Sequence, residues 1–574
     1  MSLPLPAWAQ EMRDLFRSGS VSQFLLHGNI FDVVPAEADG QSKMLSLKAF
    51  LDEVMFSTYD VVLHYDRGHG IRAVRGADDW GDWLDQVGLG AARGLEIRES
   101  GKALEVLDRY LLRTLNLQAV KGGARRLKIA IIVEFAEYVV PQGQPLQLQG
   151  EYSANVVKVL GWANDPAIQQ SNIVTVLVAE GLGDLNQLVV ENPHAAKLRI
   201  PLPDEAAMEQ YLRLLVSQQS LDLATCCEVP LEVLAKRLTG LSRVGAQTVV
   251  NLATRNNRKI TAAYLAKMKK EMIERDCQGL LEFIESPYTL DHVAGLDAVK
   301  AWLRDDAILL KRLALHALPM GYLIAGRIGT GKTFLVQCWA GELGVPCAVF
   351  KNFRDKWVGA TESNLEKIFA ILRALGQVVV FVDEADQVAG RREGEGGDSG
   401  LSGRVYAMLA QEMSDTRNRG KVLWVFATSR PDLLEVDLKR QGRLDVHIPL
   451  FGPQTPPEVR ALLLAVARKL KFPLAEADLP EIPADLKLGG HEIEGALVRA
   501  LRQHELSPEP QASLKEILAG VLVEVRPSAH TRRLEYMDLI AVKECTDRRF
   551  LPPQFVDMTP EAIEDRLAEL RRFI

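Results

Sequence analysis

Short apolar runs alternate with longer amphipathic stretches along the chain, which is the pattern of parallel strands separated by helices. Four runs in the first half have the length of buried strands: Gln23–His27, Val61–Tyr65, Lys128–Val133 and Ile173–Ala179. Helical spacing between them predicts helices such as Leu47–Phe56 and Leu104–Leu115. The first half therefore reads as an α/β core.

The second half repeats this order. A helix-rich stretch over residues 204–276 follows the first core, and then four more predicted strands appear: Tyr322–Ala325, Val345–Phe350, Val378–Val382 and Val422–Ala427. From Pro456 to about residue 545 the pattern is mainly helical again. We expect four segments: an α/β core at 1–203, a helical lid and linker at 204–280, a second α/β core at 281–455, and a lid with a C-terminal helix at 456–574.

Two further segments are predicted from local composition. Arg391–Gly403 is rich in Gly, Ser and acidic residues and is expected to be a surface loop. Pro560–Ile574 is expected to be an amphipathic helix capped by Thr559, because its apolar residues fall on one face: Ile563, Leu567, Leu570 and Ile574. Packing on the body or on another subunit is favoured over membrane anchoring.

Composition narrows the class of protein. The 574 residues are 47% apolar and 25% charged, which excludes a disordered chain, a fibrous repeat and a disulfide scaffold. The net charge of −7 falls almost equally on the two halves, which disfavours nucleic acid as a partner. Charged residues near the N-terminus, and no apolar run longer than Ile173–Ala179, predict a cytoplasmic protein without a membrane partner.

A glycine-rich loop with the pattern GxxxxGK[ST] follows the predicted strand Tyr322–Ala325. It reads Gly326-Arg327-Ile328-Gly329-Thr330-Gly331-Lys332-Thr333. The glycines let backbone amides curl around a polyphosphate, and the next helix adds the positive end of its dipole. Lys332 would reach the β- and γ-phosphates, and the Thr333 hydroxyl would ligate Mg²⁺. The strand–loop–helix context favours this interpretation over a chance glycine loop.

An acidic pair ends the strand Val378–Val382, 50 residues further on. Asp383 and Glu384 would emerge at the carboxyl end of a central strand, which is where ligands bind in open α/β sheets. Asp383 would complete the Mg²⁺ site, and Glu384 would polarise the attacking water. The alternative is a strand that ends in an acidic turn, and the nearby glycine loop disfavours it.

Further motifs follow the order known from one family. They are Leu290–Leu296, Val425–Pro431, Leu438–Asp445 and Gly489–Ile493. Together with the two motifs above, they make residues 280–505 resemble an AAA-family ATPase module. The chain departs from the family at His292, where Asp is usual, and at Ser429, where Asn is usual.

The resemblance implies a nucleotide pocket and its catalytic groups. The backbone of Val293 and Ala294 would contact adenine, and Phe334, Gly490 and His491 would complete the ATP-binding set. Since the usual Asn helps to align the attacking water, the shorter catalytic-site Ser429 predicts slower ATP hydrolysis.

The resemblance also implies assembly and a substrate pore. Arg440 and Arg443 match the arginine fingers that complete a neighbouring subunit's site in a ring, for which we expect a hexamer. A solvated surface pair is the alternative. Lys356-Trp357-Val358, followed by Gly359, stands where the family has its central pore loop, and an aromatic there would grip an extended polypeptide. The alternative is a tryptophan packed in the core.

The first half resembles a degenerate AAA module. Gly28-Asn29-Ile30 follows the first strand without a Lys-Thr pair, Glu134 and Phe135 stand where the family has Asp and Glu, and no arginine pair is present at the finger position. An unrelated α/β domain is the alternative. A degenerate first module joined to an active second one resembles the AAA proteins of chloroplast and cyanobacterial genomes.

The predicted fold class is therefore α/β, with two tandem AAA-type modules, each a parallel-sheet core plus a small helical lid. The expected function is a ring-forming ATPase that uses ATP and Mg²⁺ to remodel or thread a protein client. The first alternative is a nucleotide-gated scaffold or assembly factor that threads nothing. The even acidic charge disfavours a second alternative, a nucleic-acid motor.

Overall fold

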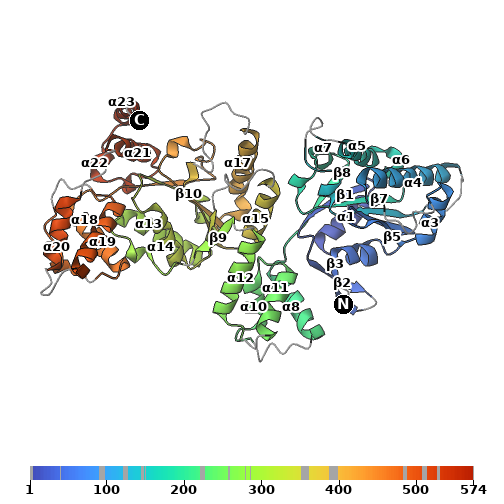
Figure 1. Ribbon diagram of the computed structural model, residues 1–574, viewed down its shortest axis with the longest axis horizontal. Coiled ribbons are helices and arrows are strands. Elements are labelled where there is room, and N and C mark those ends of the chain that lie inside the picture. The colour runs from blue at the N-terminus through green and yellow to red at the C-terminus, as the bar shows by residue number, and fades with distance from the viewer. Residues whose placement is uncertain are drawn as a thin grey trace. The chain divides into compact units, whose positions relative to one another are not determined.

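The computed structural model describes most of the chain, in two compact units. The described residues are 4–38, 41–89, 97–120, 127–143, 148, 150–219, 227–255, 259–277, 280–284, 286–350, 361–386, 399–472, 474–482, 488–506, 513–525 and 531–572. One unit comprises residues 1–273 with 358–374, and the other comprises 274–357 with 375–574. Figure 1 shows the chain coloured from the N-terminus to the C-terminus.

The first unit contains a six-stranded sheet in the order β5-β4-β6-β7-β1-β8. Its strands are β1 (Gln23–Gly28), β4 (Val61–Asp66), β5 (Gly70–Arg75), β6 (Ile129–Val133), β7 (Ile173–Val178) and β8 (Ala195–Ile200). All neighbours pair in parallel except the edge strand β5, which is antiparallel to β4. A separate hairpin, β2 (Val33–Ala38) and β3 (Gln41–Ser46), is inserted directly after β1.

The second sheet has the order β14-β10-β13-β12-β11-β9. Its strands are β9 (Leu281–Ile284), β10 (Gly321–Gly326), β11 (Cys347–Phe350), β12 (Val378–Val382), β13 (Val422–Thr428) and β14 (Val446–Leu450). Again the edge strand, β9, is the antiparallel one. In each sheet the five parallel strands, numbered along the chain, lie in the order 5-1-4-3-2. The prediction of an α/β fold with two modules of one type is confirmed.

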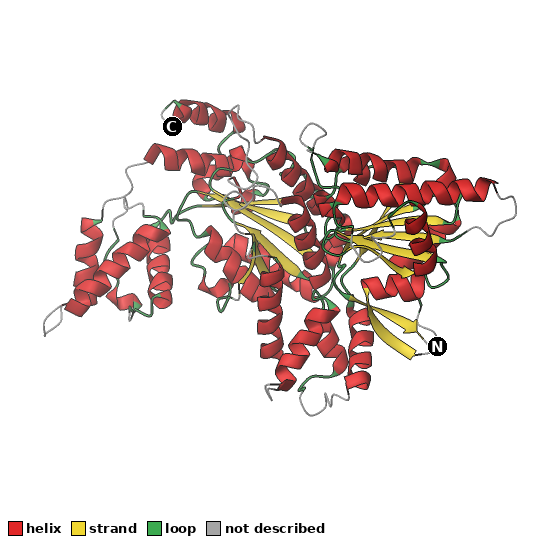
Figure 2. Ribbon diagram, turned by 45° about the vertical axis from the view of Figure 1, so that its right-hand side comes forward, coloured by secondary structure: helices red, strands yellow, loops and turns green. Residues whose placement is uncertain are grey.

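Helices surround both sheets (Figure 2). Those of the first half are α1 (Ala7–Arg17), α2 (Leu47–Phe50) continued by the π-helical turn η1 (Leu51–Met55), α3 (Ala77–Gln86), α4 (Ser100–Val120), α5 (Glu151–Asn164), α6 (Pro166–Gln169), α7 (Gln187–Val190), α8 (Glu205–Gln219), α10 (Leu231–Leu238), α11 (Arg243–Arg255) and α12 (Ala262–Asp276). Alternate strand residues enter two separate apolar clusters, with Leu25 in one and its neighbours Phe24 and Leu26 in the other. The strands are therefore buried on both faces, which explains their continuous apolar sequence.

The helices of the second half fall into three groups. They are α13 (Asp297–Lys311), α14 (Lys332–Leu343), α15 (Thr361–Leu375) and α17 (Ser399–Ser414), then α18 (Pro456–Lys469), α19 (Gly490–Leu506) and α20 (Leu514–Glu524), and finally α21 (Thr531–Glu544), α22 (Pro553–Val556) and α23 (Pro560–Arg571). Helices α18 to α20 share an apolar core of their own. The last group packs elsewhere, because α21 lies against β10 and β14 of the sheet.

The two local predictions have different outcomes. The capped C-terminal helix is confirmed: Thr559 accepts a hydrogen bond from the amide of Ala562, and the predicted apolar face is buried, although Ile574 lies outside the described residues. The predicted loop Arg391–Gly403 is wrong over Ser399–Gly403, which begins α17; residues 391–398 are not described. Buried Leu409 and Met413 anchor this helix, and packing outweighs the weak helix propensity of Gly and Ser.

None of the helices in the described part of the chain combines the length and the apolar character that crossing a membrane requires.

Candidate functional site

A cavity of the second half, with a volume of about 690 Å³, lies at the carboxyl end of its sheet. The ends of three strands that are neighbours in the sheet contribute to its lining. They supply the loop that follows β10, the pair Thr428 and Ser429 at the end of β13, and the pair Asp383 and Glu384 after β12. In open α/β sheets this edge is the usual place of a ligand, and the volume is that of a small-molecule site.

The loop after β10 needs its glycines for two different reasons. At Gly326 a Cβ atom would lie 2.3 Å from the carbonyl oxygen of Leu450, so no side chain fits there. Gly329 and Gly331 have φ angles of 86° and 84°, a left-handed conformation that strains other residues. Helix α14 then begins at Lys332, and no side chain caps its first turn. Its amide groups and the positive end of its dipole are thus suited to an anion.

Lys332 is held inside this loop. Its ammonium donates hydrogen bonds to the carbonyl oxygens of Gly326 (2.8 Å) and Arg327 (3.1 Å). Burial lowers the pKa of Lys332, and the nearby carboxylates, of which Asp383 has the largest effect, oppose that change. A half-buried cation beside the uncapped amides of a helix N-terminus is the kind of donor set that a polyphosphate requires.

Two oxygen ligands meet beside Lys332. The hydroxyl of Thr333 donates a hydrogen bond of 2.7 Å to Oδ2 of Asp383. Hydroxyl and carboxylate oxygens are ligands that Mg²⁺ accepts, usually together with phosphate oxygens and water. The next residue, Glu384, has a φ of 48°, and its amide donates to Oδ1 of Asp383. The residues present therefore fit a magnesium–polyphosphate.

Most residues predicted for this site line the one cavity. They are Val293, Ala294, Ile328, Gly329, Thr330, Gly331, Lys332, Thr333, Phe334, Asp383, Glu384, Ser429, Gly490 and His491. The lid residue Gly490 also donates its amide to the carbonyl oxygen of Gly329, at 2.9 Å. Gly326 and Arg327 do not line the cavity.

The predicted arginine fingers do not line this cavity. Arg440 is 72% exposed and Arg443 19% exposed, and both pair with Asp437. Hydrogen bonds from Arg443 and Arg440 lower the pKa of that carboxyl group. The predicted pore residues Lys356, Trp357 and Val358 lie outside the described residues.

Sequence reasoning missed one wall of the cavity. Residues 549–553, which lead into the first residue of α22, line it together with Lys469 and Glu494 of the lid. Their sequence, Arg-Phe-Leu-Pro-Pro, follows no nucleotide-binding pattern. The prolines favour an extended backbone in the residues before them and carry no signal for a nucleotide.

The first half keeps the frame of this site with different chemistry. A Cβ on Gly28, at the end of β1, would lie 2.7 Å from the carbonyl oxygen of Ile200, the same close approach as at Gly326. Phe135 follows β6 with a φ of 54°, the conformation that Glu384 has after β12. The loop after β1, however, enters the strand β2 and not a helix.

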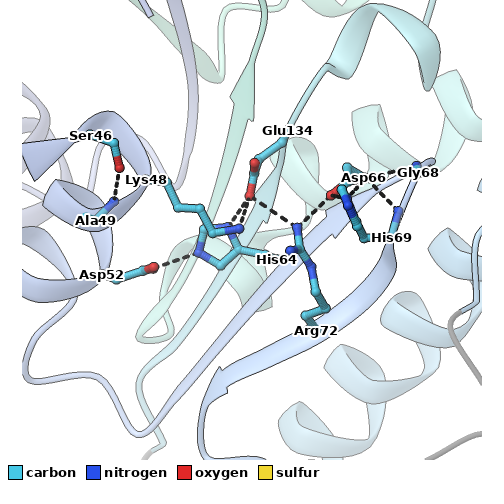
Figure 3. Close-up of polar contacts among 10 residues, drawn as sticks. All are labelled: Ser46, Lys48, Ala49, Asp52, His64, Asp66, Gly68, His69, Arg72 and Glu134. Carbon is cyan, nitrogen blue, oxygen red and sulfur yellow. Dashed lines mark hydrogen bonds and ion pairs between the residues drawn. The ribbon is translucent and has the colours of Figure 1, made fainter. Parts of the chain in front are cut away.

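Figure 3 shows the charged side chains that meet at this second place. Lys48 donates to Oε1 of Glu134 at 2.8 Å. The two ring nitrogens of His64 lie 2.6 Å from Glu134 and 2.7 Å from Asp52. Burial lowers the pKa of His64, but these hydrogen bonds outweigh burial and raise it above its usual value. Burial likewise raises the pKa of Glu134, and the bonds from His64 and Lys48 lower it to about 2.

The lid of the first half is fastened by a carboxylate of the chain itself. Buried Asp32 accepts hydrogen bonds from the amide of Val244 (3.0 Å), from Asn29 (2.9 Å) and from Arg243 (3.3 Å). Val244 is the second residue of α11, so the Asp32 carboxylate lies at that helix N-terminus, where negative charge is favourable.

Comparison with known protein families covers most of the chain. Residues 2–201 match the family described as "AAA+ chaperone, N-terminal Rossmann-like domain", and residues 208–278 match "AAA+ chaperone, second helical domain". Residues 322–451 match "ATPase family associated with various cellular activities (AAA)".

Curated relatives are similar over part of their length. The ATP-dependent zinc metalloprotease FtsH 1 of Symbiobacterium thermophilum is 32% identical over 41% of this chain and 42% of the relative. The peroxisomal ATPase PEX6 of Candida glabrata is 28% identical over 49% of this chain and 30% of the relative. FtsH 3 of Sphaerobacter thermophilus is 31% identical over 49% and 60%. The chain thus spans between 30% and 60% of the length of these relatives.

The charges around His64 predict a pH optimum for the stability of the first unit. With a raised folded pKa, His64 contributes fully below about pH 6.5 and loses its contribution as the pH rises through the folded value. Glu134 contributes fully above about pH 4.5 and loses its contribution as the pH falls toward about 2. Hydrogen-exchange protection in β4 and β6, corrected for intrinsic rates, should be highest between these limits.

The substitution Glu134→Gln removes the negative charge that both His64 and Lys48 contact, while its amide oxygen can still accept a hydrogen bond. It should lower the protection at the optimum and flatten the profile on both sides. A Glu134→Gln profile that keeps the wild-type shape would contradict this role of the network.

Proposed function

Because the chain belongs to the AAA family of ATPases, we propose that its second half binds and hydrolyses ATP with Mg²⁺. The observation that carries the proposal is the contact between Thr333 and Asp383 beside Lys332, in one cavity with Glu384. Phosphoryl transfer to water depends mostly on positioning and charge stabilisation, to which groups in this arrangement would contribute.

The mechanism divides the work among the cavity residues. The amides of the loop and Lys332 would hold the phosphates, and Thr333 and Asp383 would hold Mg²⁺, whose charge would offset that of the phosphates. Glu384 orients and polarises the attacking water, and Ser429 assists from the next strand. Glu384, in its left-handed turn directly after Asp383, lines the same cavity, which supports this role.

Arg440 and Arg443 would act on a neighbouring subunit. Neither lines the cavity of its own chain, and Arg440 is largely exposed, as a residue that reaches a partner must be. We infer a homo-oligomeric ring, a hexamer in the first instance, in which hydrolysis depends on assembly. Arg443 would either break its ion pair with Asp437 and reach the neighbouring subunit itself, or keep that pair and so help Asp437 to hold Arg440.

The work driven by hydrolysis would be the remodelling or threading of a protein client by a pore at Trp357. The chaperone-type families matched by the first half and the uniform acidic charge support a protein client. A nucleotide-gated scaffold, without threading, is the second candidate. The cytoplasm is the proposed location, and the four segments 1–203, 204–280, 281–455 and 456–574 are the proposed domains.

The first half would act without nucleotide. Lys48 places an ammonium on Glu134, the position that corresponds to the metal-binding Asp383, and Asp32 places a carboxylate at the N-terminus of the lid helix α11. Internal charges thus stand where cation and anion would be bound. A module of this kind would recruit clients or support the ring, and its own conformation would stay the same while the second half hydrolyses ATP.

The substitution Glu384→Gln tests the hydrolytic role. It keeps the size of the side chain and removes the group that polarises water, so turnover should fall by ~10²–10⁴-fold while ATP binding stays within about twofold. Phosphate release and calorimetry measure the two quantities. A matched control is Glu105→Gln, an exposed carboxylate on α4 that pairs with Arg109. Full turnover in Glu384→Gln would remove the assigned role.

The substitution Trp357→Ala separates threading from scaffolding. If Trp357 grips a client, ATP hydrolysis should persist while ATP-dependent unfolding of a bound client is lost. Clients for this assay can be captured on the hydrolysis-deficient Glu384→Gln protein with ATP, using ADP as the control. Unchanged work on the client in Trp357→Ala would favour the scaffold.

A further inference from the structure

The side chain of Arg327, the second residue of the glycine-rich loop, points away from the cavity. Its Nη1 lies 3.6 Å from Oδ2 of Asp538 on α21, and the side chain is 15% exposed. Its Nη2 passes so close to Gly452 that a Cβ added there would lie 2.2 Å from it. Gly452 belongs to the segment that joins β14 to the lid helix α18, and its missing side chain leaves the path that Arg327 takes to α21.

The backbone of Arg327 forms part of the phosphate-binding arrangement. Its carbonyl oxygen accepts hydrogen bonds from the ammonium of Lys332 at 3.1 Å and from the hydroxyl of Thr330 at 3.0 Å. A contact that fixes the position of Arg327 therefore also fixes one of the carbonyl groups that hold the Lys332 ammonium. The ion pair with Asp538 is a tie between this loop and a helix more than two hundred residues later in the chain.

Asp538 is a costly residue for a helix that packs on a sheet. Its side chain is 13% exposed, and among the described residues its Oδ1 has no hydrogen-bond partner. Burial raises the pKa of Asp538 to about 6, although Arg327 acts to lower it. A buried, half-satisfied carboxylate reduces stability compared with an apolar side chain. The contact with Arg327 is what accounts for a carboxylate at this buried position.

The support behind Asp538 is firm, because the C-terminal segment is packed at several points around the same cavity. Tyr536, Leu539 and Ile540 of α21 are buried in one apolar cluster with α23. Phe555 stacks on Phe451 at 5.1 Å between ring centroids, directly after β14.

The same segment touches the connection to the lid a second time. Gln554 donates a hydrogen bond of 2.7 Å to Oε1 of Gln454, two residues after Gly452. Residues 549–553 line the cavity itself. The C-terminal segment thus contacts the loop, the lid connection and the cavity wall of one site.

We propose that Asp538 is a positioning residue for nucleotide binding, which holds Arg327 and thereby the loop that orients Lys332. The inference rests on the proposed function of the second half and adds a residue outside its motifs. Asp538 touches neither nucleotide nor metal, and it acts on affinity through Arg327. The catalytic step, which depends on Asp383 and Glu384, is left to those residues.

A double-substitution cycle in the full chain tests this assignment. The dissociation constant of Mg²⁺–ATP is measured by calorimetry, and KM and kcat by phosphate release, for wild type, Asp538→Leu, Arg327→Met and the double variant. Each single substitution should raise the dissociation constant and KM by roughly 3- to 10-fold, as for coupled residues of one network, with kcat within about twofold. The double variant should be no weaker than either single variant.

Two further variants keep the outcome decisive. Asp538→Asn retains an acceptor for Arg327 and should recover part of the affinity lost in Asp538→Leu, while Glu564→Gln, an exposed carboxylate on α23 that pairs with Lys543, should change nothing. Additive losses in the cycle, or a lower melting temperature with wild-type affinity in Asp538→Leu and Asp538→Asn, would reduce Asp538 to a structural role and overturn the proposal.

Failure of the proposed function has a different signature. A wild-type chain that binds ATP without hydrolysing it contradicts the hydrolysis, while the calorimetric cycle still decides the role of Asp538. A wild-type chain that binds no ATP overturns both.

Discussion

One contact distinguishes the two halves of this chain at the carboxyl ends of their sheets. It joins the acidic residue after the third parallel strand to the second residue of the next helix after the first parallel strand, which in the first half comes only after the hairpin β2–β3. In the second half these are Asp383 and Thr333, a carboxylate and a hydroxyl that leave room for a cation. In the first half they are Glu134 and Lys48, and the cation is already a side chain of the protein. The two halves differ here because the second residue of the helix is a lysine in the first half and a threonine in the second.

The backbone arrangement around this contact is the same in both halves. Both sheets have the strand order 5-1-4-3-2 with an antiparallel edge, both need a glycine where the first strand passes the fifth, and both place a left-handed residue after the third strand. Phe135 keeps the turn of Glu384 without its carboxylate. The first half thus has the same backbone arrangement, with ion pairs between its own side chains at the place where the second half has Thr333 and Asp383.

The sequence predicted most of this frame and only part of its chemistry. Apolar runs located the central strands, and the glycine loop and the acidic pair pointed to one cavity, since these signals are local and strongly patterned. The edge strands β5 and β9 and the hairpin β2–β3 were missed, because half-exposed strands have weaker apolar patterns. The buried edge strand β14 was missed as well, since His447 and Pro449 interrupt its apolar run. The network around His64 joins residues up to 86 positions apart, between Lys48 and Glu134, and no local pattern marks such a contact. Asp538 and residues 549–553 were missed for the same reason, since only the return of α21 to the sheet brings Asp538 to Arg327 and residues 549–553 to the cavity.

We propose that, of the two modules of one fold in this chain, only the second has a working ATP site. Native mass spectrometry of the Glu384→Gln chain with Mg²⁺ and ATP counts the nucleotides bound per chain most directly. The account predicts one nucleotide per chain, none after the added substitution Lys332→Ala, and still one after Lys48→Ala. Two nucleotides per chain, or a nucleotide that survives Lys332→Ala, would contradict it.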